Sequence, residues 1–320
     1  MILLMSAKGK LAVVAVGGNS LILDSKHQTV PDQYDAACRT MVHVADMIEQ
    51  GYNVVLTHGN GPQVGFILLR SEIARSQLHP VPLDSCGADT QGAIGYNFQM
   101  ALGNEFKKRG IKKPVVTVVT QVLVDKNDPS FKKPSKPIGQ FYTEAEAKDR
   151  MKNDGWAMVE DAGRGWRRVV ASPLPLEIIE ENAITTLTDK GFCVVAVGGG
   201  GIPVIRNDKG NLEGTAAVID KDFASALLAS NIKADMFIVS TAVEKACLNF
   251  GKPDQKALDK VTVAELEQYC KEGHFKPGSM LPKCEAIIKF IKNGGKHAII
   301  TNPENLAKAV KGEAGTHVYP

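Results

Sequence analysis

Three glycine-rich segments each follow an apolar run that is typical of a buried strand. They are Ala-Val-Gly-Gly-Asn at 15–19, His-Gly-Asn-Gly-Pro at 58–62 and Val-Gly-Gly-Gly-Gly at 197–201, and the first two lead into helical patterns. Glycine lets the backbone approach a phosphate closely, while the N-terminus of a following helix adds free N–H groups and a favourable dipole. The sequence therefore predicts a shared pocket for a phosphate or another small anion.

Strand-like and helix-like segments alternate along most of the chain and must position these loops. The strands are continuous apolar runs without a polar face, which is typical of a parallel sheet covered on both sides by helices. We therefore expect an α/β fold with a mainly parallel central sheet. The predicted strands are 11–16, 53–57, 115–119, 193–197, 236–240 and 297–301, and the predicted helices are 33–50, 87–109, 221–230, 263–271, 283–292 and 303–310.

One segment, residues 125–166, breaks this alternation. It is rich in Lys, Asp, Pro and Gly and has no long apolar run to bury. It is interpreted as a small subdomain that protrudes from the main sheet. On composition alone, an inert surface elaboration is favoured over a lid.

Composition excludes several classes of protein. The chain has 320 residues, 44% of them hydrophobic, with a formal net charge of +3 and no cluster of lysines, so we expect a globular protein that does not bind nucleic acid. Six cysteines without a CxxC pair indicate reduced thiols in the cytoplasm. The apolar residues 1–5 are too few for a signal peptide or a membrane span.

The common nucleotide-binding motifs are missing. The chain contains no GxxxxGK[ST], no GxGxxG after the first strand, and neither HRD nor DFG. P-loop enzymes, nicotinamide-binding proteins and protein kinases are therefore disfavoured. His58 has no Ser or Cys nucleophile nearby, and it is interpreted as a residue that orients its loop through a backbone hydrogen bond.

Five motifs spread over nearly the whole chain resemble those of the carbamate kinases, a group within the amino acid kinase family. They are AVGGN at 15–19, THGNGPQVG at 57–65, SKPIG at 135–139, AVIDKD at 217–222 and PGSMLPK at 277–283. The resemblance implies a homodimeric open αβα sandwich that catalyses ATP + carbamate ⇌ ADP + carbamoyl phosphate with Mg²⁺. It also implies that the reverse direction supplies ATP during arginine breakdown.

The same resemblance implies the catalytic groups. Lys136, Lys221 and Lys283 would neutralise the phosphoryl oxygens, and Asp222 would orient the neighbouring lysines. Related kinases carry a lysine two residues before the first glycine pair, where this chain has Ala15 and Val16. We therefore expect Lys136 to supply the missing charge, which makes the protruding subdomain a lid.

The remaining expected site residues bind the ligands. Main-chain groups would hold carbamate and the phosphoryl group at Gly17, Gly18, Asn19, Gly59, Asn60, Gly61, Gly200 and Gly201. The segment after the strand 236–240 would flank the nucleotide, with Thr241, Val243 and Met280 as contacts. Mg²⁺ would be held mainly by phosphates and water, and no metal ligand is assigned.

These expectations describe one kinase domain over residues 1–320, with residues 1–190 as the acceptor lobe and 191–320 as the nucleotide-binding lobe. Its partners would be the small molecules carbamate and carbamoyl phosphate, with no nucleic acid or membrane. Two alternatives stay open. One is another kinase of this family acting on an acyl substrate or UMP, and the other is a non-catalytic nucleotide or carbamoyl phosphate sensor.

Overall fold

An eight-stranded sheet forms the centre of the molecule in the computed structural model, which describes residues 9–18, 21, 22, 24, 26–161 and 163–320. Its strand order is β15-β17-β16-β12-β1-β2-β9-β3, in which six strands are parallel and β15 and β17 run the opposite way. The mainly parallel sheet predicted from the apolar strands is therefore confirmed. The strands are β1 (Leu11–Val16), β2 (Asn53–His58), β3 (Val115–Thr117), β9 (Cys193–Val195), β12 (Met236–Ser240), β15 (Lys260–Thr262), β16 (Ala298–Thr301) and β17 (Thr316–Tyr319).

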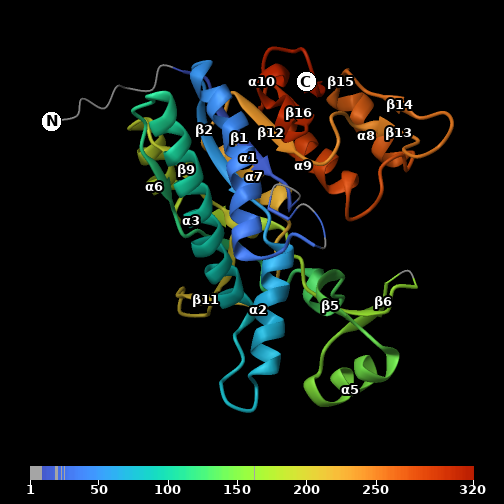
Figure 1. Ribbon diagram of the computed structural model, residues 1–320. Coiled ribbons are helices and arrows are strands. Elements are labelled where there is room, and N and C mark those ends of the chain that lie inside the picture. Colours follow the sequence, from blue (N-terminus) through green and yellow to red (C-terminus); the bar gives the residue numbers. More distant parts are fainter. Residues whose placement is uncertain (1–8, 19–20, 23, 25, 162) are drawn as a thin grey trace.

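Helices cover both faces of this sheet (Figure 1). Because successive side chains of a strand point to opposite faces, β1 contributes to two cores. Val14 packs in the cluster of α1 and α3, whereas Val13 packs in the cluster of α7 and α9. The helices are α1 (Val30–Glu49), α2 (Gly61–Ile73), α3 (Leu83–Arg109), α6 (Glu181–Asp189), α7 (Lys221–Asn231), α8 (Val263–Lys271), α9 (Met280–Lys292) and α10 (Leu306–Ala309).

The helix that follows the first glycine segment starts three residues earlier than the predicted start at residue 33. Helix α1 begins at Val30, because Thr29 forms a capping box with Asp32. The side chain of Thr29 accepts from the Asp32 N–H, and the Asp32 carboxylate accepts from the Thr29 N–H at 2.9 Å. The second segment leads directly into a helix, since α2 begins at Gly61.

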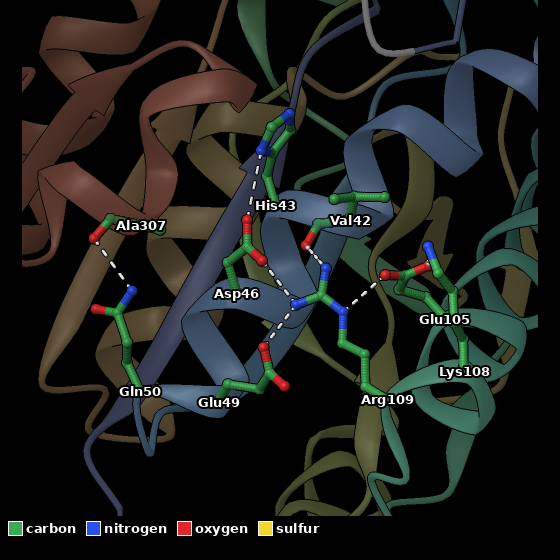
Figure 2. A network of polar contacts seen from close by, with 9 residues as sticks. All are labelled: Val42, His43, Asp46, Glu49, Gln50, Glu105, Lys108, Arg109 and Ala307. Atoms are coloured by element: carbon green, nitrogen blue, oxygen red, sulfur yellow. Dashed lines mark hydrogen bonds and ion pairs between the residues drawn. The ribbon is translucent and has the colours of Figure 1, made fainter.

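An ion-pair network joins the two helices that cover one face of the sheet (Figure 2). Arg109, the last residue of α3, donates to Asp46 at 2.6 Å, Glu49 at 2.7 Å and Glu105 at 2.7 Å. It also donates to the Val42 carbonyl at 3.2 Å. The three contacts with Val42, Asp46 and Glu49 fix the end of α3 against α1, while Glu105 lies on α3 itself and orients the guanidinium.

A second, four-stranded sheet and several short elements complete the main body. The sheet consists of β11 (Leu212–Gly214), β10 (Ile202–Arg206), β4 (Gln121–Val124) and β8 (Pro175–Ile178), in that order. The short elements are the hairpin β13 (Cys247–Leu248) and β14 (Lys256–Ala257) and the 3₁₀ turns η2 (Gly198–Gly200) and η3 (Pro303–Asn305). Within the described residues, no helix is both long and apolar enough to span a bilayer.

The protruding segment folds as a small unit of its own (Figure 1). Its three-stranded sheet has β5 (Lys136–Tyr142), β7 (Trp166–Val170) and β6 (Met158–Glu160), with α5 (Glu144–Asp154) in the β5–β6 connection, and the short α4 (Pro129–Lys132) precedes it. Because Lys136 pairs with Val170, the small sheet extends to residue 170, beyond the expected end at 166. We call residues 136–170 the lid unit.

Two glycines let the lid unit approach α2 closely. A Cβ added to Gly65 of α2 would lie 3.3 Å from the Gly139 Cα of β5. Gly139 has a left-handed φ of 70°, and the β5–β7 pairing shifts register between Ile138 and Phe141. The irregularity bends β5 and fixes where the strand leaves the main body.

Ion pairs tie the far end of the lid unit to α2. Arg150 of α5 lies 3.0 Å from Glu72 of α2, and Asp154 of α5 lies 2.8 Å from Arg150 and 2.7 Å from Arg75, two residues beyond the end of α2. The guanidinium of Arg150 also lies 5.1 Å from the ring centroid of Trp156. The lid unit is therefore attached through α2 as well as through its own two connections.

The two lobes expected from the sequence share the central sheet. Strand β9, which follows the expected boundary near residue 190, lies between β2 and β3. Strand β12 pairs with β1. Strands from both parts of the chain therefore meet side by side, and this arrangement brings their loops together.

Candidate functional site

Three loops meet at the carboxyl edge of the central sheet. In the parallel pairing, Val16 at the end of β1 lies beside His58 at the end of β2 and beside Ser240 at the end of β12. The next residues, Gly17, Gly59 and Thr241, therefore leave the sheet from adjacent strands. Ligands of open α/β folds bind at this edge.

A buried carboxylate holds two of the expected lysines. Asp222 is 3% exposed, and its two oxygens lie 2.5 Å from the Lys221 Nζ and 2.8 Å from the Lys283 Nζ. Lys221 is the first residue of α7, and Lys283 lies in the first turn of α9. Two lysines 62 positions apart in the sequence are thus brought together on one aspartate.

The charges of this cluster stabilise one another. Burial by itself would raise the pKa of Asp222, but the ammonium groups of Lys221 and Lys283 outweigh it and lower the pKa to about 2. Burial lowers the pKa of Lys221, and the charge of Asp222 opposes that shift. The cluster carries one net positive charge, which suits an anionic ligand.

The stem of Lys221 lies beside Gly59 of the second glycine segment, close to Gly18 of the first. A Cβ added to Gly59 would lie 3.6 Å from the Cδ and Cε of Lys221 and 3.7 Å from the Gly18 nitrogen. The Gly59 N–H donates to the Val16 carbonyl at 3.1 Å, so it continues the strand pairing. Lys221 therefore packs beside Gly59 at ordinary contact distance, and the Gly59 N–H is already used in the strand pairing.

Asn60 and Gly61 begin α2 beside this cluster. Asn60 is buried, and its amide donates to the Thr90 hydroxyl of α3 at 2.8 Å. Gly61 is exposed at the first position of α2. The N-terminus of this helix thus faces solvent with its Asn60 side chain already held in place. Asn19, expected in the same pocket, lies outside the described residues.

The third glycine segment packs behind the second. A Cβ on Gly199 would lie 2.1 Å from the Asn60 amide nitrogen, and one on Gly200 would lie 2.5 Å from the Ile219 carbonyl oxygen. Gly201 approaches Val122 in the same way. These glycines are buried and have φ between 66° and 93°. Close packing explains their presence, and a direct ligand role for Gly200 and Gly201 stays a prediction.

His58 contacts the backbone of its own loop, as the sequence interpretation expected. Its Nδ1 lies 3.0 Å from the Gly59 carbonyl oxygen, so Nδ1–H donates. Burial lowers the pKa of His58 to about 4. The ring is therefore neutral at pH 7 and packs edge-on against Phe98.

Lys136 lies near the cluster but pairs with a different carboxylate. Its Nζ is 2.8 Å from Oδ2 of Asp220, while Oδ1 of Asp220 accepts from the Asp222 N–H at 2.9 Å. Sequence reasoning missed Asp220. The available signal was its position directly before the helix at Lys221, because aspartate is a preferred N-cap residue.

The three residues expected to contact the nucleotide line one cavity of about 360 Å³. Thr241 and Val243 follow β12, and Met280 begins α9, one turn before Lys283. Phe275 and Lys276 also line this cavity. It therefore lies next to the lysine cluster and has apolar walls suited to a flat ring. Within the described part of the chain, no three His, Cys, Asp or Glu side chains gather as a metal site.

Comparisons with known proteins agree with this arrangement. Residues 10–302 match the model of the amino acid kinase family. The chain is 53% identical to the carbamate kinase-like protein YahI of Escherichia coli, over 97% of this chain and 98% of that protein. It is 51% identical to the carbamate kinase of Thermococcus kodakarensis, over 97% and 99%. The solved structure of carbamate kinase from Giardia lamblia bound to AMP-PNP superposes with a TM-score of 0.92 at 43% identity, covering 98% of this chain and 99% of that one.

Proposed function

This chain belongs to the amino acid kinase family and is a kinase, and we propose that it transfers a phosphoryl group reversibly between ATP and carbamate, giving ADP and carbamoyl phosphate. The observation that carries the proposal is the convergence of Lys221 and Lys283 on Asp222, beside Gly18 and Gly59. Phosphoryl transfer needs charge neutralisation and alignment rather than covalent participation by the protein. Two ammonium groups held at one carboxylate provide that neutralisation.

The acceptor half of the proposed site lies at the ends of β1 and β2. The carbamate oxygen is already an anion, so it attacks the γ-phosphorus without a general base. As that bond forms, the bond from phosphorus to the oxygen bridging to the β-phosphate breaks, and ADP leaves. Backbone groups at Gly17, Gly18, Asn60 and Gly61 orient the small acceptor, while Lys221 and Lys283 face the migrating phosphoryl oxygens.

The nucleotide half uses the cavity lined by Thr241, Val243 and Met280. Adenine lies in this cavity, and the phosphates extend toward Lys283, one turn further along α9. Mg²⁺ would be held mainly by phosphate and water oxygens, since both oxygens of Asp222 already accept from lysines. The ion supplies further charge neutralisation on the phosphates.

The lid unit, which overlaps the expected segment 125–166, brings the third charge. Lys136 is the first residue of β5 and lies at the end of the unit nearest α7. It takes the place of the lysine that this chain lacks at Ala15 and Val16. With substrate bound, the unit also keeps water from the labile carbamoyl phosphate.

The active form is a homodimer built on the exposed face of α3. Gly92 and Ala93 are exposed there, Tyr96 is 62% exposed, and the adjoining edge strand β3 leads to the exposed Val119. Small residues let a second copy of α3 approach closely, and an apolar patch favours a self-complementary contact.

All six cysteines are free thiols, which suits a protein of the cytoplasm. There the enzyme makes ATP from carbamoyl phosphate formed in arginine breakdown.

A coupled assay of ATP formation from ADP and carbamoyl phosphate tests the proposal. We expect rapid, Mg²⁺-dependent ATP formation with this donor and none with acetyl phosphate. Activity with an acyl phosphate or with UMP alone would assign a different acceptor within the family. Binding of carbamoyl phosphate and ADP without turnover would indicate a sensor. The E. coli relative named a carbamate kinase-like protein makes the choice of acceptor the decisive measurement.

A further inference from the structure

We propose that Asp220 is a positioning residue, which aligns the lid lysine with the first turn of α7. The inference rests on the proposed function, because it concerns how Lys136 reaches the phosphoryl group. Asp220 lies within the AVIDKD motif, but the resemblance gave it no role, and it does not belong to the cluster around Asp222.

The two oxygens of Asp220 have separate partners. Oδ1 accepts from the Asp222 N–H at 2.9 Å and caps α7, whereas Oδ2 lies 2.8 Å from the Lys136 Nζ. The cap fixes the carboxylate relative to the helix. One carboxylate therefore connects the start of α7, in the main body, to the start of β5, in the lid unit.

The burial of the pair makes it more effective than an ordinary surface contact. The side chains of Lys136 and Asp220 are 34% and 18% exposed. The pair Lys126–Asp208, by comparison, is 50% and 94% exposed and lies outside the site. A fully exposed pair contributes little, because water and salt screen it and two long side chains must be ordered. Partial burial reduces the screening, and the cap has already ordered one partner.

All three lysines therefore contact a carboxylate at the start of α7. Asp222 holds Lys221 and Lys283, and Asp220, two residues earlier, holds Lys136. Both oxygens of Asp222 are taken by its two lysines. Asp220 supplies the separate anchor that keeps the ammonium of Lys136 beside them before substrate binds, which reduces the ordering needed in the transition state.

The variant Asp220→Asn separates this role from the helix cap. Asparagine caps a helix as well as aspartate does, but it carries no charge. We expect kcat for ATP formation from carbamoyl phosphate to fall roughly tenfold, with the KM for ADP and the melting temperature unchanged. Asp208→Asn, which removes the charge from the exposed pair with Lys126, should leave kcat unchanged.

A double-mutant cycle with Lys136→Ala gives the decisive result. Asp220→Asn should have no further effect on kcat once Lys136 is absent, because its effect passes through that lysine. Independent losses in the two variants, or a faster Asp220→Asn enzyme, would overturn the proposal.

A measurement without turnover keeps the inference separate from the proposed function. Amide hydrogen exchange in residues 136–142 should be faster in Asp220→Asn than in the wild type, with no change in α7. Unchanged exchange in β5 would refute the anchor even in an active enzyme. If the wild type makes no ATP from carbamoyl phosphate, the proposed function fails, and the exchange result still decides whether Asp220 anchors the lid unit.

Discussion

The two lysines of the main body and the lysine of the lid unit are held in different ways. In the core, Lys221 and Lys283 extend from long helices and share the buried Asp222. In the lid unit, Lys136 begins a strand of a small sheet and has one partly exposed partner, Asp220. A buried carboxylate with two lysines is therefore part of the packed interior, whereas the proposed lid lysine has a single, more exposed ion pair.

The largest effect should follow from removing Asp222, the carboxylate that Lys221 and Lys283 share. Asp222→Ala leaves two ammonium groups at a largely buried position without their shared partner, which should cost about 3 kcal/mol of folding free energy. It should also lower kcat about 10³-fold, because both lysines lose their alignment. Urea unfolding and the coupled assay measure the two effects, with Asp208→Ala as the control for loss of a surface carboxylate. Wild-type stability in Asp222→Ala would contradict a stabilising role for this buried carboxylate.

Removing the lid lysine should affect catalysis alone. Lys136→Ala should lower kcat about 10²-fold, the scale for loss of one preorganised stabilising group. The melting temperature and the Kd for ADP should stay near the wild-type values, since this side chain is one-third exposed and lies outside the nucleotide cavity. Calorimetric titration with ADP and the coupled assay test both parts. Normal turnover in Lys136→Ala would eliminate the lid assignment.

Lowering the pH from 7 to 5 should weaken the core, which contains His58, and should leave the ion pairs of the lid unit intact. The pKa of His58 falls from its ordinary 6.5 to about 4 because the ring is buried, so the folded state favours the neutral form. The contribution of His58 to the free energy of unfolding is fully present above about pH 6.5 and is lost as the pH falls toward 4. At pH 5, relative to pH 7, the loss is about 2 kcal/mol. The segment 136–170 contains no histidine.

Urea unfolding at pH 7 and pH 5 checks this difference. His58→Gln should lose less stability than the wild type when the pH is lowered from 7 to 5. Equal pH dependence in His58→Gln and the wild type would show that His58 is not the titrating group.

The smallest effect is expected at the contact between the lid unit and α2. Arg75 is 46% exposed, so Arg75→Gln should cost less than about 1 kcal/mol and change kcat by less than about threefold. Urea unfolding measures the change in stability, and the coupled assay at low and high salt measures the change in kcat. A tenfold loss of kcat would mean that α2, rather than Asp220, sets the position of the lid.

Much of the fold was predictable because it depends on local patterns. The apolar run 236–240 is a strand with those limits, and the helix expected at 263–271 has the same limits in the structure. Other elements end at different residues than predicted because of backbone geometry. The strand expected to end at 197 ends at Val195, because Val197 takes a left-handed φ of 52° before the glycine turn.

The site was only partly predictable. Lys221, Lys283 and Asp222 were expected from motifs, but their contacts depend on the packing of α7 against α9. The third glycine segment resembled the other two in sequence, yet its glycines are required by the approach of Asn60 and Ile219. Asp220 was missed because its helix cap is a local feature, whereas its pairing with Lys136 spans 84 positions.

The alternating elements, the glycine loops at strand ends and the family of this chain can all be recognised without coordinates, because they follow from local composition and motifs. Only the tertiary structure decided that β1 lies between β2 and β12 and that α7 presents two aspartates to three lysines. Strand order and charge pairing depend on contacts between distant segments. Their free energy comes from burial and geometry that no single stretch of sequence contains.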